Sequence, residues 1–461
     1  MFTNILNTFL NCWKIPELKS RIIFTMGVLA VCLLAESIPC PGLNGSALNA
    51  YMESNAAKSG GGMLGMYNMF SGGALGKCAI GALTIMPYIS ATIIIQLLTA
   101  VIPTLSKLAR EEGGRVQIIK YSRWLTVLLC IGWGTATTMG WENPASLFPN
   151  FQGTLILDPG HIWWFRIHTV LILTTGTMVL LWLGEQITER GIGNGVSLVI
   201  TIGILGRLPA AGRALWEMFN PPAGVDVKFH IFGTGILLLG LLALVIGGVI
   251  AITQAQRKIP VQYAQRAVGR KMYQGGTSFM PLKVNYAGVM PVIFASSILM
   301  FPSFIFRWIG GNYNVPFFKH LAQELDRGSF FYMLLFGLMI LFFSYFWVAT
   351  QFNEIQIADD LKKNGGYVPG VRPGQATSDY LHRAMSRITL AGAIFLTVIA
   401  VIPILLTSNM NISHDVTQYF GGTSMLIMVG VLLDTMRQME SHLMMRHYDG
   451  FLKKGRVKGR F

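Results

Sequence analysis

Few residues in this sequence have both the type and the spacing that catalysis requires. The run from Ser71 to Cys78, SGGALGKC, is similar to a phosphate-binding loop, but Ser71 replaces its first glycine and Cys78 replaces the hydroxyl that would hold Mg²⁺. His442 and His447 are five positions apart, so a helix does not place both on one face. The motifs HExxH and GxSxG do not occur. We therefore expect no enzyme activity, no metal and no cofactor, and a driving energy that a partner supplies.

The segment 254–286 is a strongly polar region of a different kind. It carries six basic residues and no acid: Arg257, Lys258, Arg266, Arg270, Lys271 and Lys283. Val and Tyr positions around Pro260 predict a short hairpin whose tip lies near residues 269–271. Because membrane orientation alone needs fewer charges, we interpret the segment as a docking surface for an acidic partner, such as ribosomal RNA or an acidic protein face. A bare orientation signal is the alternative.

A second polar segment, 351–387, mixes acids with bases and then reads GYVPGVRPG from Gly366 to Gly374. Proline fixes φ and glycine relaxes it, so Arg372 is predicted to lie between two turns and to point outward. A lone exposed Arg is usually only solvated. One framed by Pro-Gly on both sides indicates a contact with a partner.

The elements that must position these residues are membrane helices. Charged residues make up 12% of the 461 residues and hydrophobic residues 52%, whereas soluble domains carry roughly 25% charged residues. A helix needs about 20 apolar residues to cross a bilayer. Ten such windows occur, near residues 22–38, 79–101, 121–140, 165–184, 194–208, 232–253, 287–306, 330–350, 388–407 and 420–436.

The distribution of basic residues predicts how these spans are oriented. The formal charge of +15 would suggest a nucleic-acid partner in a soluble protein, but here the basic residues fall in short loops between apolar runs. Of the 36 Lys and Arg, 27 lie on the side that holds both termini and 9 on the other. Positive charge favours the cytoplasmic side, so both termini are expected to be cytoplasmic.

We expect an all-α polytopic membrane protein with ten transmembrane helices in two halves of five. Residues 1–208 form the N-terminal half, and residues 209–461 form the C-terminal half with the loops 254–286 and 351–387. An odd number of spans per half means that repeated halves must be inverted in the membrane. An apolar stretch at about 62–76 is too short to span, and it is expected either to lie on the outer surface or to insert into the protein.

Charged residues inside the windows are few. Glu36 and Asp434 lie near the ends of their spans, and so does the basic residue Arg207, while Arg123 and Arg166 are the other basic ones. Buried charge in hydrocarbon is costly and often marks an ion path. The windows therefore contain too few acidic residues to form a proton or sodium relay built from carboxylates.

Five stretches carry a resemblance to a known family. They are IMPYISATIIIQLL (85–98), GEQITERGIGNG (184–195), PLKVNYAGVMPVIFASSI (281–298), GYVPGVRPG (366–374) and YFGGTSMLI (419–427). In order and spacing they strongly resemble the SecY family, the channel subunits of bacterial Sec translocons. The resemblance implies a protein-conducting channel whose pseudo-symmetric halves open like a clamshell, hinged near the connection between spans five and six, around a central hourglass pore.

The resemblance also implies roles for apolar residues. A ring of aliphatic side chains would form the pore constriction, at Ile85, Ile89, Val196, Ile200, Ile293 and Ile427. Apolar rings resist wetting and ion leak yet deform around a passing chain. The short outer stretch looks like a plug helix, with Met66, Tyr67, Asn68, Met69, Phe70, Ser71, Gly72 and Gly73. The glycine pair would let that plug move.

Spans two and three facing spans seven and eight would form a lateral gate toward lipid. Its candidate residues are Ser90, Trp133, Ser296 and Ser297, and Trp133 occupies a position where the family leads us to expect a polar residue. The implied contact surface for the SecA ATPase or the ribosome consists of Arg257, Lys258, Arg266, Arg270, Lys271 and Arg372.

By the same resemblance, SecE would clamp the two halves, and SecG would be a third subunit. The substrates would be unfolded, signal-bearing polypeptides, whose transmembrane segments leave sideways into membrane lipids. The expected location is the bacterial cytoplasmic (inner) membrane. Two rival interpretations remain: a secondary solute transporter, which needs a polar midplane site, and an intramembrane enzyme, which needs a catalytic constellation.

Overall fold

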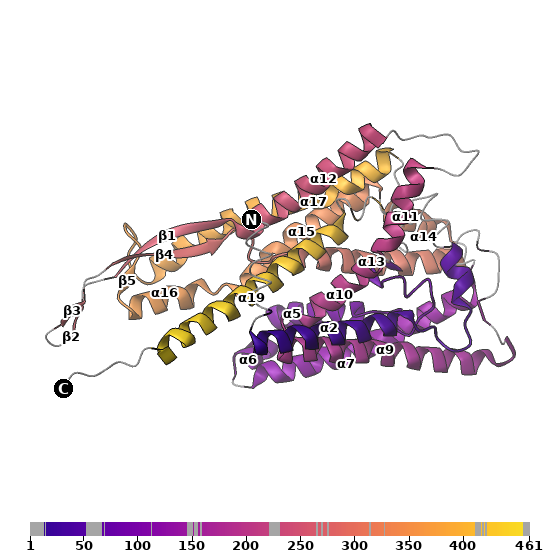
Figure 1. Cartoon of the computed structure of the whole chain (residues 1–461), viewed down its shortest axis with the longest axis horizontal. Coiled ribbons are helices and arrows are strands. Elements are labelled where there is room, and N and C mark those ends of the chain that lie inside the picture. Colours follow the sequence, from indigo (N-terminus) through magenta and orange to yellow (C-terminus); the bar gives the residue numbers. More distant parts are fainter. Residues whose placement is uncertain are drawn as a thin grey trace.

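The structure is a computed structural model of the chain (Figure 1). It describes residues 13, 15–51, 67–68, 70–111, 113–144, 151, 155–156, 159–220, 231–263, 266–268, 271–273, 276–312, 315–326, 328–410, 416, 419 and 422–454. Long helices run side by side along the longest axis of the molecule, and a small sheet extends from one end of the bundle.

The N-terminal half contains both long and short helices. They are α2 (Pro16–Ser37), α5 (Met86–Val101), α6 (Pro103–Arg110), α7 (Gly114–Glu142), η1 (Pro159–His161), α9 (Ile162–Arg190) and α10 (Gly195–Gly206). Proline stands in the first turn of α2, α5 and α6, where its missing N–H costs nothing. The left-handed backbone of Gly113, at φ 81°, separates α6 from α7.

The C-terminal half holds the remaining helices and the strands. The helices are α11 (Leu208–Phe219), α12 (Ile231–Gln254), α13 (Met290–Asn312), α14 (Pro316–Glu324), α15 (Phe330–Gln351), α16 (Glu354–Lys363), α17 (Gln375–Met410) and α19 (Thr423–Lys454). The strands are β1 (Gln256–Tyr263), β2 (Arg266–Val268), β3 (Lys271–Tyr273), β4 (Thr277–Lys283) and β5 (Gly366–Tyr367).

Each of the ten predicted windows contains a helix, but their boundaries and their hydropathy differ. Among the described residues, seven helices are long and apolar enough to cross a membrane, or eight if the pair α5 and α6, bent by 106°, is one span. Helices α7 and α19 are not in that set. The second window begins at Met86 and not at residue 79, because residues 71–85 form turns. The fifth window is a helix of only 12 residues, α10, followed directly by α11.

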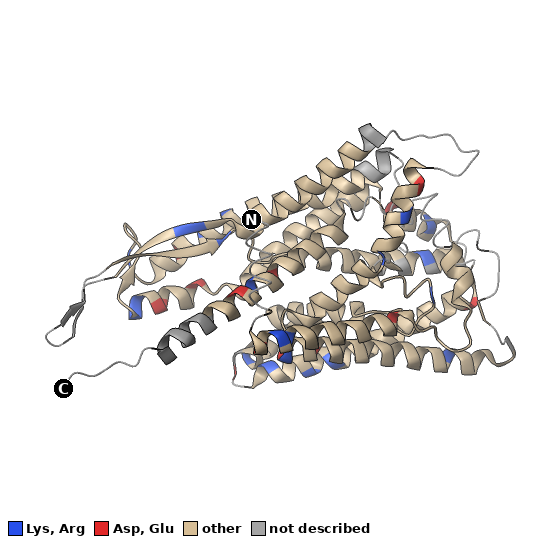
Figure 2. Cartoon of the chain, in the orientation of Figure 1, with Lys and Arg blue, Asp and Glu red and all other residues tan. Residues whose placement is uncertain are grey.

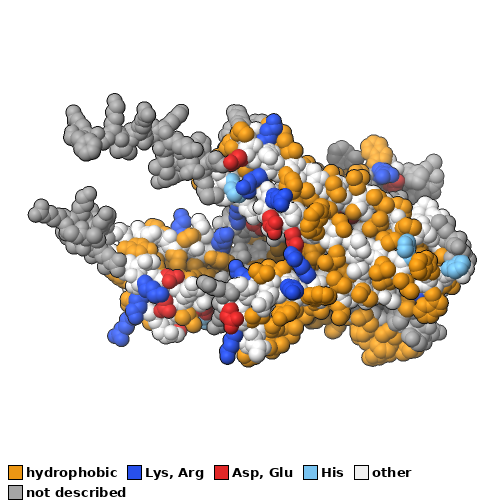
Figure 3. All heavy atoms as spheres, turned by 90° about the horizontal axis from the view of Figure 1, so that it is seen from below, with side chains coloured by type: hydrophobic (Ala, Val, Ile, Leu, Met, Phe, Trp, Pro, Cys, Tyr) orange, Lys and Arg blue, Asp and Glu red, His pale blue; other side chains and the backbone are white. Residues whose placement is uncertain are grey.

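The outer faces of the bundle are apolar. Large hydrophobic side chains such as Leu34, Trp124, Leu239 and Phe342 are at least half exposed. Figure 3 shows hydrophobic side chains over much of one face, with charged side chains gathered toward one end. Figure 2 places the described Lys, Arg, Asp and Glu mainly toward the ends of the helices. A surface of this kind is matched to lipid, as the ten predicted spans require.

Three strands form a sheet in the order β4-β1-β5, which we call the basic sheet. Strands β1 and β4 pair antiparallel, with Gln256 opposite Lys283. The small hairpin β2–β3 pairs Val268 with Lys271, which confirms the predicted hairpin, while Gly269 and Arg270 of its predicted tip lie outside the described residues. A separate hydrophobic cluster, which includes Ile259, Leu282 and Leu381, joins the sheet to the first turns of α17.

Candidate functional site

The outer stretch inserts into the helix bundle and does not lie on its surface. We call its described part, residues 67–68 and 70–85, the inserted segment. Tyr67, Asn68 and Phe70 are helical and buried, and Tyr67 and Phe70 belong to the main core cluster. Of the residues implied as the plug, Met66 and Met69 lie outside the described residues. The insertion alternative is therefore the correct one.

Hydrogen bonds within the inserted segment hold its turns. The Gly76 N–H donates to Asn68 Oδ1 at 2.8 Å, and the Gly73 N–H donates to the Asn68 carbonyl at 2.7 Å. The Ser71 hydroxyl donates to the same carbonyl at 3.0 Å. Burial raises the pKa of the Cys78 thiol, so this buried cysteine is neutral and unreactive near pH 7.

Backbone contacts through glycines fix the segment against its surroundings. A Cβ on Gly45 would lie 2.1 Å from the Lys77 carbonyl oxygen, and one on Gly176 of α9 would lie 2.4 Å from that of Ile80. The Ile80 N–H also donates to the carbonyl of Ile38, just after α2, at 2.9 Å. Only glycine permits such close approach, so the fit depends on shape more than on polar chemistry.

The six residues implied as the pore ring belong to one hydrophobic region. Five are buried in the main core cluster, and Val196 packs against it while partly exposed. They come from four separate helices and one helix cap: Ile85 caps α5, Ile89 lies on α5, Val196 and Ile200 lie on α10, Ile293 on α13 and Ile427 on α19. Tyr67 and Phe70 of the inserted segment belong to the same cluster.

The residues implied as the lateral gate lie between α5 and α13, except for one. Ser90, Ser296 and Ser297 are buried, and the Ser297 hydroxyl contacts Met86 Sδ across the two helices at 3.6 Å. The Ser90 hydroxyl has no hydrogen-bond partner. Trp133 of α7 packs instead on Tyr67, with 5.8 Å between ring centroids. The tryptophan therefore contacts the inserted segment, which explains an aromatic where a polar residue is expected.

Two basic residues within spans have partners that the sequence does not reveal. Arg123 forms two hydrogen bonds to Glu185, the shorter at 2.7 Å, and Arg166 pairs with Glu142 at 2.8 Å. Both pairs join α7 to α9. These arginines therefore stabilise helix packing and do not form an ion path. Among the described residues, no group of three His, Cys, Asp or Glu could hold a metal.

The loop between α9 and α10 joins distant parts of the chain. The Ile192 N–H donates to Thr25 Oγ1 of α2 at 3.1 Å, and the Gly193 N–H donates to Gln438 Oε1 of α19 at 2.9 Å. Gly195 approaches Gly184 so closely that a Cβ would lie 1.8 Å from the Gly184 carbonyl oxygen. The motif GEQITERGIGNG therefore serves as a backbone joint between α9, α10 and α19.

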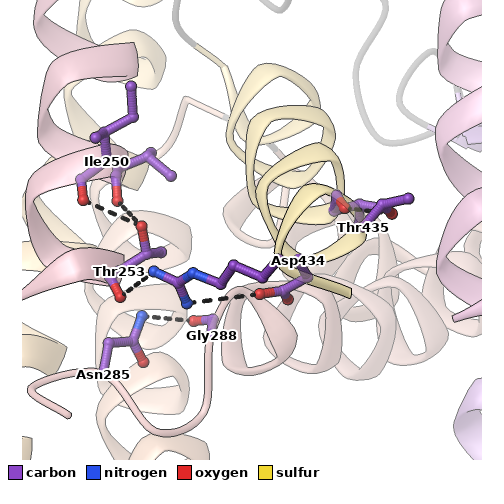
Figure 4. Close-up of polar contacts among 9 residues, drawn as sticks. Ile250, Thr253, Asn285, Gly288, Asp434 and Thr435 are labelled. Atoms are coloured by element: carbon purple, nitrogen blue, oxygen red, sulfur yellow. Dashed lines mark hydrogen bonds and ion pairs between the residues drawn. The ribbon is translucent and has the colours of Figure 1, made fainter. Parts of the chain in front are cut away.

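Helix α19 is also held to α12. Figure 4 shows Thr253 at the end of α12 facing Asp434 of α19, with Asn285 and Gly288 beside them. Arg437 bridges the gap: its guanidinium donates to the Thr253 carbonyl at 2.6 Å and lies 4.0 Å from Asp434. Asn285 donates to the carbonyl of Gly288 at 2.8 Å. The polar segment 254–286 thus begins at a fixed point.

The basic sheet presents the predicted contact residues. Arg257 and Lys258 on β1 are exposed, and so is Arg372. A turn from Val368 to Val371 precedes Arg372, and Gly374, at φ 101°, follows it, so the predicted framing by two turns is confirmed. Arg266 and Lys271 lie in β2 and β3, but their side chains and the whole of Arg270 lie outside the described residues.

The structure unites the two polar segments. Strand β5, only two residues long, pairs with β1, and the Tyr367 hydroxyl donates to Gln262 Oε1 at 3.0 Å. Arg372 therefore lies on the same end of the molecule as the basic strand β1. The sequence carries no signal for this pairing, since a two-residue strand has no periodicity.

Comparison with known proteins agrees with this architecture. The family model described as SecY matches residues 79–436. The protein translocase subunit SecY of Chlamydia trachomatis is 40% identical over 460 residues, which are 98% of this chain and 99% of that protein. A solved structure described as "The structure of a protein conducting channel" matches with a TM-score of 0.59 at 17% identity, over 95% of this chain and 94% of that chain. The canine Sec61 structure in a ribosome-channel complex matches with the same TM-score at 16% identity and the same coverage.

Proposed function

The chain belongs to the SecY family, and on that premise we propose that it is a protein-conducting channel for unfolded, signal-bearing polypeptides. The observation that carries this function is the inserted segment: residues 67–85 enter a bundle of membrane helices and meet its aliphatic core. A segment held inside a bundle by its own turns can close a path and can leave it. A channel that closes with part of its own chain needs no catalytic group.

We assign the constriction to the six aliphatic residues at Ile85, Ile89, Val196, Ile200, Ile293 and Ile427. Their shared membership of one apolar region supports the assignment. Such a region excludes water and ions when idle and offers no specific contact to a passing chain. The inserted segment would then seal the outer side.

We assign the path toward lipid to the contact between α5 and α13. The serines there are small, and among the described residues their side-chain hydrogen bond across the two helices is the weak contact from Ser297 to Met86. A contact of this kind separates at low cost, so apolar segments could leave between the helices. The N-terminal half, residues 1–208, and the C-terminal half, residues 209–461, would move apart there.

The partners follow from the basic sheet and from the relatives. The exposed Arg257, Lys258 and Arg372 suit an acidic partner, for which the ribosome and the SecA ATPase are the candidates. SecE and SecG would complete the complex. The bacterial cytoplasmic membrane would hold it, with both termini and the basic sheet in the cytoplasm. The secondary solute transporter is not supported, because every comparison above leads to a translocation channel.

Protease protection tests the proposed function directly. The full chain is reconstituted with SecE and SecG in proteoliposomes, and SecA, ATP and a radiolabelled signal-bearing precursor are added. We expect protection of the precursor that depends on this chain and on the signal sequence. A complex that is intact and binds SecA but yields no protected precursor would contradict the channel function.

A further inference from the structure

One acidic side chain lies beneath the inserted segment and has no role in the function described so far. Glu36, in the last turn of α2, is 3% exposed. Its Oε2 atom has no hydrogen-bond partner. Burying a carboxyl group with an unpaired oxygen is costly, and such a group requires a physical explanation.

Glu36 forms part of the surface on which the inserted segment rests. A Cβ on Gly72 would lie 2.5 Å from Glu36 Oε2 and 3.1 Å from the Gly203 carbonyl oxygen. A Cβ on Gly203 of α10 would lie 3.3 Å from Glu36 Oε1 and 3.1 Å from the Phe70 carbonyl oxygen. The carboxylate, the inserted segment and α10 therefore meet with no room for a methyl group.

Positive charge is near Glu36 but does not neutralise it fully. The Lys77 ammonium attracts the carboxylate electrostatically. Among the described residues, however, Lys77 and Glu36 form neither an ion pair nor a hydrogen bond with each other. Lys77 is itself partly exposed, and Arg207 lies beside Gly73, where a Cβ would be 3.8 Å from its Nε. While the segment is in place, the nearby positive charges therefore do not offset the cost of burying this carboxyl group.

We propose that Glu36 sets the closing equilibrium of the inserted segment, because burying its carboxyl group weakens the closed state that its shape helps to form. The buried group must either lose its hydration as a carboxylate or take up a proton, and both costs are relieved when the segment leaves and water reaches it. The acid therefore favours opening, and the segment rests in a closed state that is only marginally stable. This inference rests on the proposed channel function and adds a residue that determines how readily the channel opens.

Removal of the charge with its shape retained is the primary test. Glu36→Gln should lower the open probability of the idle complex in a planar bilayer by between about five- and thirtyfold. Glu217→Gln is the matched control, since Glu217 is an exposed acid on α11. Alkylation of Cys78, mapped by mass spectrometry, gives a second readout, because this buried thiol reacts only when the segment moves. The rate of Cys78 alkylation should fall in Glu36→Gln by a similar factor.

A second variant tests the electrostatic cause. Lys77→Met removes the attraction that Lys77 exerts on the carboxylate and should raise the open probability. In the Glu36→Gln background the same change should have no effect, since no charge remains to be compensated. Equal effects in both backgrounds would overturn the proposal.

The outcomes separate this inference from the proposed function. If Glu36→Gln raises the open probability or leaves it unchanged while the wild-type complex translocates precursor, Glu36 does not weaken the closed state and the inference fails alone. If the wild-type complex neither conducts nor translocates, the channel function fails and the inference fails with it. Lower opening and slower Cys78 alkylation in Glu36→Gln, with wild-type behaviour in Glu217→Gln, support it.

Discussion

The inserted segment and the basic sheet are both excursions from the helix bundle, but they are built in opposite ways. The inserted segment is buried, apolar at Tyr67 and Phe70, and fixed by glycine contacts at backbone distance. The basic sheet projects from the bundle, exposes Arg257 and Lys258, and has its own small core. One depends on fit within the protein, and the other presents charge to a partner.

The difference teaches where substitutions should act. In the inserted segment, small changes of volume alter the packing, because a close-packed interior has no space to absorb them. In the basic sheet, volume matters little and charge matters more, since the side chains face solvent. The predictions below test that division.

The largest expected effect concerns a glycine beside the inserted segment. Gly45→Ala places a methyl group 2.1 Å from the Lys77 carbonyl oxygen, and we expect a loss of about 3 kcal/mol in the free energy of unfolding. Gly276→Ala, next to β4, is the matched control because nothing lies within 4 Å of its Cβ. Thermal unfolding of the detergent-solubilised complex measures both. Equal stability of the two variants would show that the inserted segment is no more sensitive to added volume than the basic sheet.

The next effect concerns the apolar seal. Replacing Ile89 and Ile293 by Ser should raise ion conductance of the idle channel roughly tenfold, because polar side chains favour wetting. Ile94→Ser is the control, since Ile94 lies on the same helix as Ile89 but is 38% exposed. Planar-bilayer recording gives the readout. Unchanged conductance in the double variant would assign the seal to the inserted segment alone.

A charge reversal on the other region should act without altering the fold. Arg372→Glu should reduce partner-driven translocation by about tenfold, because an exposed contact residue then repels an acidic partner. Expression and thermal stability should remain normal, since Arg372 lies in an exposed turn. Lys362→Glu, an exposed reversal on α16, is the control. Normal translocation by the Arg372 variant would exclude it from the contact surface.

The smallest effect concerns a solvent-exposed hydrogen bond of the basic sheet. Tyr367→Phe removes the bond to Gln262 Oε1, and we expect a stability change below about 1 kcal/mol. Hydrogen exchange of the β1 and β5 amides should increase slightly, with the helices unchanged. A loss as large as that of Gly45→Ala would show that the sheet is as tightly coupled to the bundle as the inserted segment is.

The helices and the basic hairpin could be predicted because their signals are local. Apolar windows locate helices, and the Val and Tyr positions around Pro260 indicate the hairpin, whose strands are paired. The predicted boundaries were less accurate. Helix α5 begins seven residues after the start of its predicted window, because residues 79–85 form turns that tie the inserted segment to α2. No periodic pattern signals such turns.

The residues missed are those whose partners are far away in sequence. Arg123 and Glu185 are 62 positions apart, and Gly72 and Glu36 belong to different elements, so their contacts depend on helix packing. Trp133 shows the same limit: its neighbour Tyr67 lies in a segment whose insertion the sequence left undecided. The pore ring and the lateral gate came from family resemblance, and their roles remain predictions.

The pairing of β5 with β1 has a consequence for the order in which the chain is assembled. About 100 residues separate the two strands, and α13 and α15 lie between them. The sheet cannot gain its third strand until both helices have been synthesised and inserted, because closing so long a connection must wait for the elements within it. A partner that requires Arg372 beside β1 would therefore engage only chains whose helices up to α15 have already been inserted.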